Sequence, residues 1–155
     1  MTHHTKFWGR HSDNDAPAAQ AKGYERMAEL TVPADKDYLP LVRTSAMQVG
    51  ALLELPLPQV TDLRLAVDEA CSSFMIAAPG RQLEPAASTG ATLNLSYDRD
   101  PDYLRVTVAG PAPAMWPVQN ELGWEMLRAV VGDVQAEVAD GVGTLTMIEP
   151  LPHAF

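Results

Sequence analysis

Cysteine, basic residues and long apolar runs are all scarce in this sequence. Cys71 is the single cysteine, so the chain cannot form an internal disulfide bond, and nothing in it indicates an oxidising compartment. We interpret Cys71 either as a semi-buried, inert thiol or as a redox control of a partner interface. Eleven lysines and arginines stand against twenty aspartates and glutamates, for a formal net charge of −9. Such a charge is unsuited to neutralising phosphates, so we expect no direct binding to nucleic acid and favour a basic protein partner.

Apolar residues make up 46% of the chain, but they are dispersed. None of the runs approaches the roughly 18 apolar residues of a membrane span, and the start, "MTHHTKFWGRHSDND", lacks the apolar core of a signal peptide. We therefore expect a cytoplasmic protein that does not bind a membrane. Residues 1–26 are polar and without periodicity, so we expect a disordered tail there, followed by one folded domain over residues 27–151.

Apolar periodicity predicts an α+β domain over the rest of the chain. Helices are indicated by apolar residues at three- and four-residue spacing, strands by alternation, and boundaries by proline and glycine. Strands are expected at residues 28–33 (an edge strand, because Pro33 stops it), 91–97, 103–108, 133–139 and 143–149, and helices at about 37–54, 60–78 and 120–131. Because helices lie between strands that are mostly joined as hairpins, we predict a two-layer α/β sandwich. Its largely antiparallel mixed sheet would carry the helices on one face.

The helix expected at 60–78 carries two adjacent carboxylates, Asp68 and Glu69. Neighbours on a helix point about 100° apart, so these two cannot converge on one bond as a catalytic pair would. Asp68 lies opposite the apolar stripe, where it can form a weak surface ion pair with Arg64, four residues earlier. Glu69 and Ser73 flank the buried face, where a cleft could open.

Three stretches carry a resemblance to a known family. They are "YLPLVR" (38–43), "DLRLAVDEA" (62–70) and "ELGWEMLRAVVGDVQAEVADGVGTLTMIEPL" (121–151). Together they resemble the RsbW/SpoIIAB-type anti-sigma factors, which are serine-kinase-like members of the GHKL ATPase superfamily. The likeness is greatest to the actinobacterial, mycobacterial-type members. It spans about residues 28–150 and implies the Bergerat (GHKL ATPase-like) fold.

The resemblance also implies a nucleotide site beside the helix at 60–78. Glu69 matches the glutamate of the family's N-box, which positions or activates the hydroxyl that receives phosphate. Four residues later Ser73 stands where the family has a magnesium-binding asparagine, and Ala77 stands where a histidine often follows. A serine hydroxyl can bind Mg²⁺ but is shorter than the amide, so only weak metal binding is expected at Ser73.

The two other nucleotide motifs of the family are incomplete. No acidic residue occurs between Tyr103 and Asn120, so the aspartate that anchors adenine is missing, and Gly110 is what remains of that motif. Loss of a hydrogen bond to a charged acceptor costs about 1.5–3 kcal/mol, roughly a tenfold to hundredfold loss of affinity. Gly123 matches a phosphate-binding glycine, but Glu121 replaces another, and its charge would repel a triphosphate. We therefore expect no required cofactor, and at most weak binding of ATP with Mg²⁺.

Three functions remain open. The one we favour is an anti-sigma factor with a degenerate ATP site, which sequesters an alternative sigma factor of the stress or sporulation type and is released by an anti-anti-sigma factor. The second is an active serine kinase that phosphorylates that anti-anti-sigma factor, and the third is a ligand-sensing α/β domain. The family commonly works as a homodimer, which we expect here. Arg43, Trp116 and Trp124 are the candidate partner-binding residues, with a solvated arginine and simple packing of the proline-rich loop as their alternatives.

Overall fold

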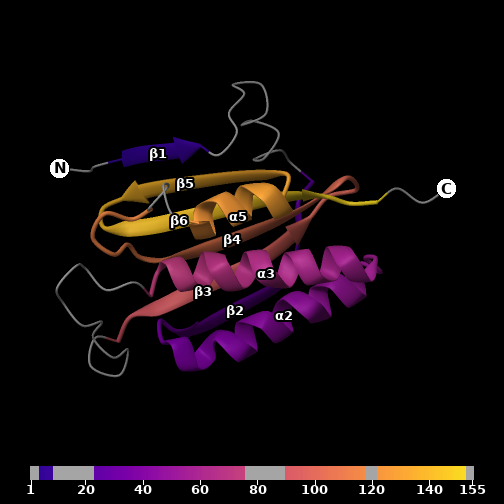
Figure 1. Cartoon of the computed structure of the whole chain (residues 1–155), viewed down its shortest axis with the longest axis horizontal. Helices are drawn as coiled ribbons and strands as arrows, with labels where there is room; N and C mark the ends of the chain where they lie inside the picture. The colour runs from indigo at the N-terminus through magenta and orange to yellow at the C-terminus, as the bar shows by residue number, and fades with distance from the viewer. Residues whose placement is uncertain (1–3, 9–22, 76–89, 118–121, 153–155) are drawn as a thin grey trace.

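The computed structural model describes residues 4–8, 23–75, 90–117 and 122–152 of the 155-residue chain. Its strands form one six-stranded sheet in the order β1-β5-β6-β4-β3-β2 (Figure 1), and every neighbouring pair is antiparallel. The strands are β1 His4–Trp8, β2 Glu25–Pro33, β3 Thr92–Arg99, β4 Tyr103–Pro111, β5 Asp133–Ala139 and β6 Val142–Pro150. β2 lies at one edge, as expected for the strand that ends at Pro33.

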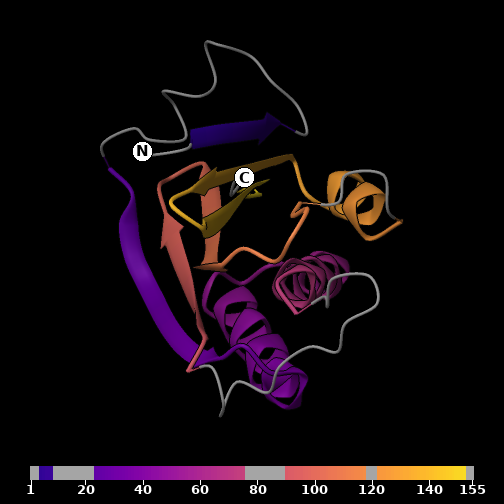
Figure 2. The ribbon, with the colours of Figure 1, turned by 90° about the vertical axis from the view of Figure 1, so that its left-hand side faces the viewer.

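The helices of the described residues cover one face of this sheet. They are α2 Leu39–Leu52, α3 Leu57–Ser73 and α5 Leu122–Val130, with a short 3-10 helix, η1 Lys36–Tyr38, before α2. Figure 2 shows all three α-helices on the same side of the curved sheet. The expected α+β two-layer sandwich, with helices on one face of an antiparallel sheet, is confirmed. The expected helices and strands differ from the observed ones by a few residues at their ends; residues 76–89, where α3 was expected to finish, lie outside the described residues.

The core lies between the helix layer and the sheet. Alternate strand residues face the helices, because successive side chains of a strand point to opposite faces. The residues of this set with at most 1% exposure include Leu93, Leu95, Tyr97, Leu104, Val106, Val108, Leu145 and Met147. The hydroxyls of Tyr97 and Ser45 are 2.8 Å apart and hydrogen-bonded, so the buried phenol has a partner on α2.

Helices α2 and α3 pack closely side by side. Gly50 allows this approach, because a Cβ at that position would lie 2.9 Å from Cγ2 of Val60 on α3. Nearer the start of α2, Arg43 Nε donates to Asp68 Oδ1 at 2.8 Å. The prediction that Asp68 pairs with Arg64 is therefore wrong: α3 turns Asp68 toward α2, where a cation of the neighbouring helix reaches it. Both side chains are partly exposed, so the pair contributes roughly 0–1 kcal/mol.

The predicted disordered tail over residues 1–26 is wrong for β1 and for the start of β2. β1 pairs with β5, from His4 opposite Ala139 to Trp8 opposite Gln135, and β2 already begins at Glu25. A five-residue strand gives too short an alternation to stand out in a polar segment, and its partner strand lies near the other end of the chain. Residues 9–22 lie outside the described residues. In the part of the chain that the structure describes, each helix falls short of the length or hydropathy that a bilayer span requires.

Cys71 lies on α3 with no exposed surface. Burial, with a smaller contribution from the charge of Asp68, raises the pKa of its thiol to about 12. A thiol that is both neutral and inaccessible is inert. The position of Cys71 therefore favours the inert-thiol interpretation over redox control of an interface.

We expect Cys71 to react with a water-soluble disulfide reagent at pH 8 about a hundredfold more slowly in the native protein than in denaturant.

The raised pKa of Cys71 in the folded state also implies that the neutral thiol stabilises the fold fully below the unfolded pKa of about 8.5. This contribution is lost as the pH rises toward 12. Cys71→Ala should flatten the alkaline fall in the free energy of unfolding, measured by urea titration at each pH. Native labelling as fast as in denaturant would contradict the burial.

Candidate functional site

Glu69 lies on the side of α3 that faces α5. A Cβ built on Gly123, in the first turn of α5, would overlap the Glu69 carboxylate, so the glycine leaves room for that side chain. A carboxylate near a helix N-terminus is favoured by the helix dipole, and the same position suits a phosphate. The structure thus brings together Glu69 and Gly123, the predicted catalytic and phosphate-binding residues. The Glu69 carboxylate occupies the space that a side chain at position 123 would need.

Ser73, one turn further along α3, already has its hydroxyl engaged. Its Oγ donates to the Ala70 carbonyl oxygen at 2.7 Å, and Trp116 Nε1 donates to the same Oγ at 3.0 Å. A hydroxyl has one proton and two lone pairs, so the proton and one lone pair are taken within the chain. Ser73 therefore serves as the anchor for a tryptophan side chain.

The indole of Trp116 packs into the interior and is 6% exposed. Its ring lies 4.6 Å from that of Phe74, centroid to centroid, at an interplanar angle of 34°. Both rings lie against β6, where a Cβ at Gly143 would lie 2.8 Å from Trp116 Cζ3 and 3.0 Å from Phe74 Cε1. Trp116 thus joins the segment after β4 to α3 and to the sheet.

Gly110, a predicted nucleotide-binding residue, lies in β4 directly opposite Gly143 of β6. A Cβ at Gly110 would lie 2.5 Å from Leu93 Cδ2 and 3.0 Å from the Thr92 carbonyl oxygen. Close packing of β3 against this position explains the glycine. Gly110 pairs with Gly143, which lies against the Trp116 ring, so it is near the other predicted site residues.

The three predicted partner-binding residues have different settings. Trp124, in the first turn of α5, is 6% exposed like Trp116. Both indoles therefore pack their segments onto the domain, which was the alternative to a role as exposed anchors. Arg43 lies elsewhere, on α2, with its side chain 42% exposed and bound to Asp68. It is accessible to a partner. Ala77 and Glu121 lie outside the described residues.

This arrangement does not fit Mg²⁺ with ATP. Magnesium requires nearly octahedral oxygen coordination, whereas the Ser73 hydroxyl, which would supply one ligand, already donates to Ala70 and accepts from Trp116. Within the described ranges, no group of three or more His, Cys, Asp and Glu residues is placed to hold a metal ion. We derive no catalytic step through a nucleotide at this position.

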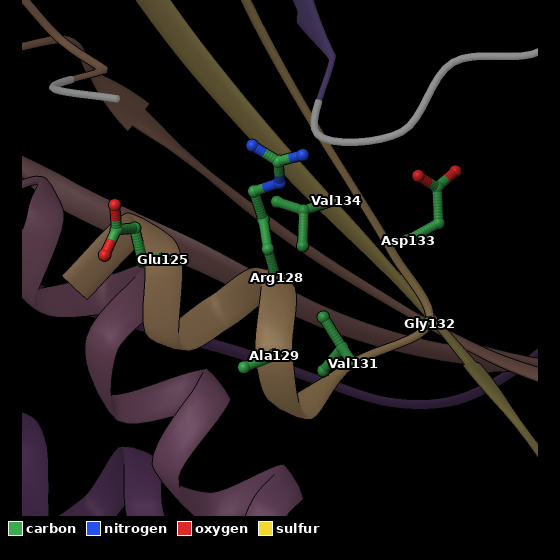
Figure 3. A pocket seen from close by; sticks show the side chains of 7 residues that line it. All are labelled: Glu125, Arg128, Ala129, Val131, Gly132, Asp133 and Val134. Atoms are coloured by element: carbon green, nitrogen blue, oxygen red, sulfur yellow. The ribbon is translucent and has the colours of Figure 1, made fainter. Parts of the chain in front are cut away.

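A hollow of about 340 Å³ lies between α5 and the start of β5 (Figure 3). Figure 3 shows Glu125 and Arg128 on α5, with Asp133 and Val134 on the strand; Ala129, Val131 and Gly132 complete the lining. None of the predicted site residues lines this hollow. Its position gives no support to a role for those residues in ligand binding there.

Two residues around Ser73 escaped the sequence analysis. Phe74 was assigned only to the apolar stripe of its helix, and Gly143 only to a strand. A glycine inside a strand pattern does signal close approach of another group, but it does not say which group. Trp116 was recognised as part of the loop, and its burial on α3 depends on a contact between residues 43 positions apart.

The contact between Glu69 and Gly123 can be tested by a double-mutant cycle. Alanine exceeds glycine in helix propensity by about 0.8–1 kcal/mol, so Gly123→Ala should stabilise a chain that already carries Glu69→Ala. In the wild-type background the new methyl group must displace the Glu69 carboxylate, so the same change should destabilise. We expect a coupling of roughly 1–2 kcal/mol by urea unfolding. Equal effects in both backgrounds would show that the two residues do not touch.

Comparison with known proteins points to the family that the sequence resembles. No family model matches the chain. Its curated relatives include the "Anti-sigma-F factor RsbW" of Mycobacterium tuberculosis strain CDC 1551 and the protein of the same name from strain H37Rv. Each is 32% identical over 125 residues, which cover 80% of this chain and 69% of the relative. Such identity over most of both chains shows common descent, and the chain belongs to the RsbW family of anti-sigma factors.

Proposed function

We propose that this protein sequesters an alternative sigma factor and keeps it from core RNA polymerase. The observation that carries the proposal is the 32% identity with proteins named for their action on sigma-F, extending over 125 residues. The packed domain supports it, because each strand and helix that the sequence predicts between β2 and β6 is present. Such a protein acts where the polymerase is, so we propose a cytoplasmic location.

The outer side of α2, with the turn that leads to α3, is the surface we propose for the partner. It carries exposed apolar residues, namely Leu41, Met47, Leu52 and Leu57, at 46–77% exposure. Arg43 lies on the same helix. Apolar side chains beside a charged residue give a docking surface both buried area and orientation. We also propose that an anti-anti-sigma factor competes for this surface, and that the protein acts as a homodimer, in keeping with the family resemblance.

We further propose that sequestration does not depend on kinase activity. The engaged hydroxyl of Ser73 and the buried indole of Trp116 support this, because Ser73 is the residue that the resemblance aligns with the family's magnesium-binding asparagine. The alternative of an active serine kinase is favoured by one feature, the retention of Glu69. Transfer of labelled phosphate from ATP to a serine of the anti-anti-sigma factor would support that alternative.

The sigma-factor proposal is tested by co-expression with candidate sigma factors, followed by size-exclusion chromatography. We expect one sigma factor to co-elute with the wild-type protein. Met47→Glu should weaken that complex about tenfold or more, because it puts a charge into the proposed apolar contact. Val142→Glu, at a similarly exposed apolar residue at the start of β6, serves as the matched control and should leave the affinity unchanged. If no candidate co-elutes, the ligand-sensing domain becomes the better interpretation.

The nucleotide proposal is tested separately by isothermal titration calorimetry of the wild-type protein with Mg-ATP. We expect no binding in the micromolar range, since a weak site needs concentrations above about 1 mM for half-saturation, equivalent to about −4 kcal/mol. A micromolar dissociation constant would overturn the degenerate site. It would leave the sigma-factor result standing.

A further inference from the structure

The interior position of Trp116 depends on how the chain turns just before it. Met115 adopts a left-handed backbone conformation with φ 64°, and the Trp116 N–H donates to the Pro113 carbonyl oxygen at 3.1 Å. As a result the Met115 side chain is 79% exposed while the next residue is 6% exposed. The turn therefore directs one large side chain outward and its neighbour into the domain.

Three surfaces receive the indole. The ring of Phe74 lies against it at 4.6 Å, and Ser73 Oγ accepts its N–H at 3.0 Å. The backbone of Gly143 forms the third surface, since any side chain there would meet the ring at 2.8–2.9 Å. Together these residues form a slot that suits a flat ring with an N–H donor at its edge. We call these three residues the ring slot.

The ring slot lies within the nucleotide site that the resemblance implies. It contains Ser73, which the resemblance aligns with the magnesium-binding asparagine of the N-box, and Gly143, which pairs with Gly110 of the adenine motif. We propose that the Trp116 indole is a built-in occupant of the former nucleotide site. It takes the place of a bound heteroaromatic ligand, so the domain is complete without nucleotide. This inference rests on the proposed function, in that it takes α3 as the wall of a degenerate ATP site. Any ligand must displace the indole first.

An emptied slot should accept a free planar ring in place of the missing one. Trp116→Gly removes the indole and should lower Tm by about 6–20 °C, the range implied by large-to-small core substitutions in a domain of this size. Added indole should then raise Tm in a saturable way, because a ligand that binds only the folded state stabilises it by mass action. Adenine, which is also planar with N–H donors and carries no phosphate, should do the same.

The comparison uses thermal unfolding of the whole chain with indole or adenine. We expect both compounds to stabilise Trp116→Gly by several degrees and to leave the wild-type protein unchanged. Trp124→Gly, which removes an equally buried indole on α5, is the matched control and should not respond to adenine. Two results would overturn the proposal: no response of Trp116→Gly to indole, or a response to indole without one to adenine. Sigma-factor binding by the wild-type protein is measured independently, so its failure is distinguishable from either result.

A second variant covers the case in which Trp116→Gly does not fold. Gly143→Ala places a methyl group 2.8 Å from Trp116 Cζ3 and 2.9 Å from Cε3, so it should expel the indole while keeping it in the chain. With Trp8→Phe and Trp124→Phe in the background, Trp116 is the sole tryptophan. Its emission should shift to the red and become accessible to iodide. Gly132→Ala, whose new methyl would meet Ile148 and Pro150 instead, should leave the emission unchanged. Unchanged, protected emission in folded Gly143→Ala would overturn the proposal.

Discussion

The rotation of α3 about its own axis determines where every candidate residue of this protein lies. Leu63, Val67, Ala70 and Phe74 bury one side of the helix, which fixes its orientation against the sheet. The flanks then have definite neighbours. Asp68 faces Arg43 of α2, whereas Glu69 faces Gly123 of α5. Two adjacent carboxylates thus have separate neighbours, one on α2 and one on α5, because a single residue step on a helix turns a side chain by about 100°.

The elements with local signals could be predicted, and the contacts between distant residues could not. The hairpin of β3 and β4, the helices and the edge position of β2 follow from alternation, three- and four-residue spacing and proline, all of which act within a few residues. β1 escaped because its stabilising partner, β5, lies far along the chain. The partner of Asp68 was wrong for a related reason: spacing on one helix offered Arg64, while packing of two helices offered Arg43. In the candidate site, Glu69, Ser73, Gly110 and Gly123 were identified and Trp116 was named, but the contact between Trp116 and Ser73 was not predicted.

The proposed loss of the nucleotide site involves more than missing ligands. A site that had merely lost its aspartate and asparagine would leave buried polar groups without partners, which is costly. Here the Ser73 hydroxyl has partners for both its proton and a lone pair, Ala70 and the indole N–H of Trp116. A compact domain without nucleotide requires such compensation, because an interior void loses the contacts of its lining. The Ser73 hydroxyl and the Trp116 indole therefore satisfy each other's hydrogen bonding.

Three glycines of the chain illustrate the same compensation. The space left by the absent side chain at Gly110 is filled by Leu93, at Gly123 by Glu69, and at Gly143 by Trp116. Glycines at a phosphate site leave the backbone open to a ligand, whereas each of these is closed by a side chain of the protein itself. A sequence motif records only that the side chain is absent. Because the same absence serves close packing equally well, glycines alone could not distinguish an ATP-binding member of this family from one whose interior is filled by its own residues.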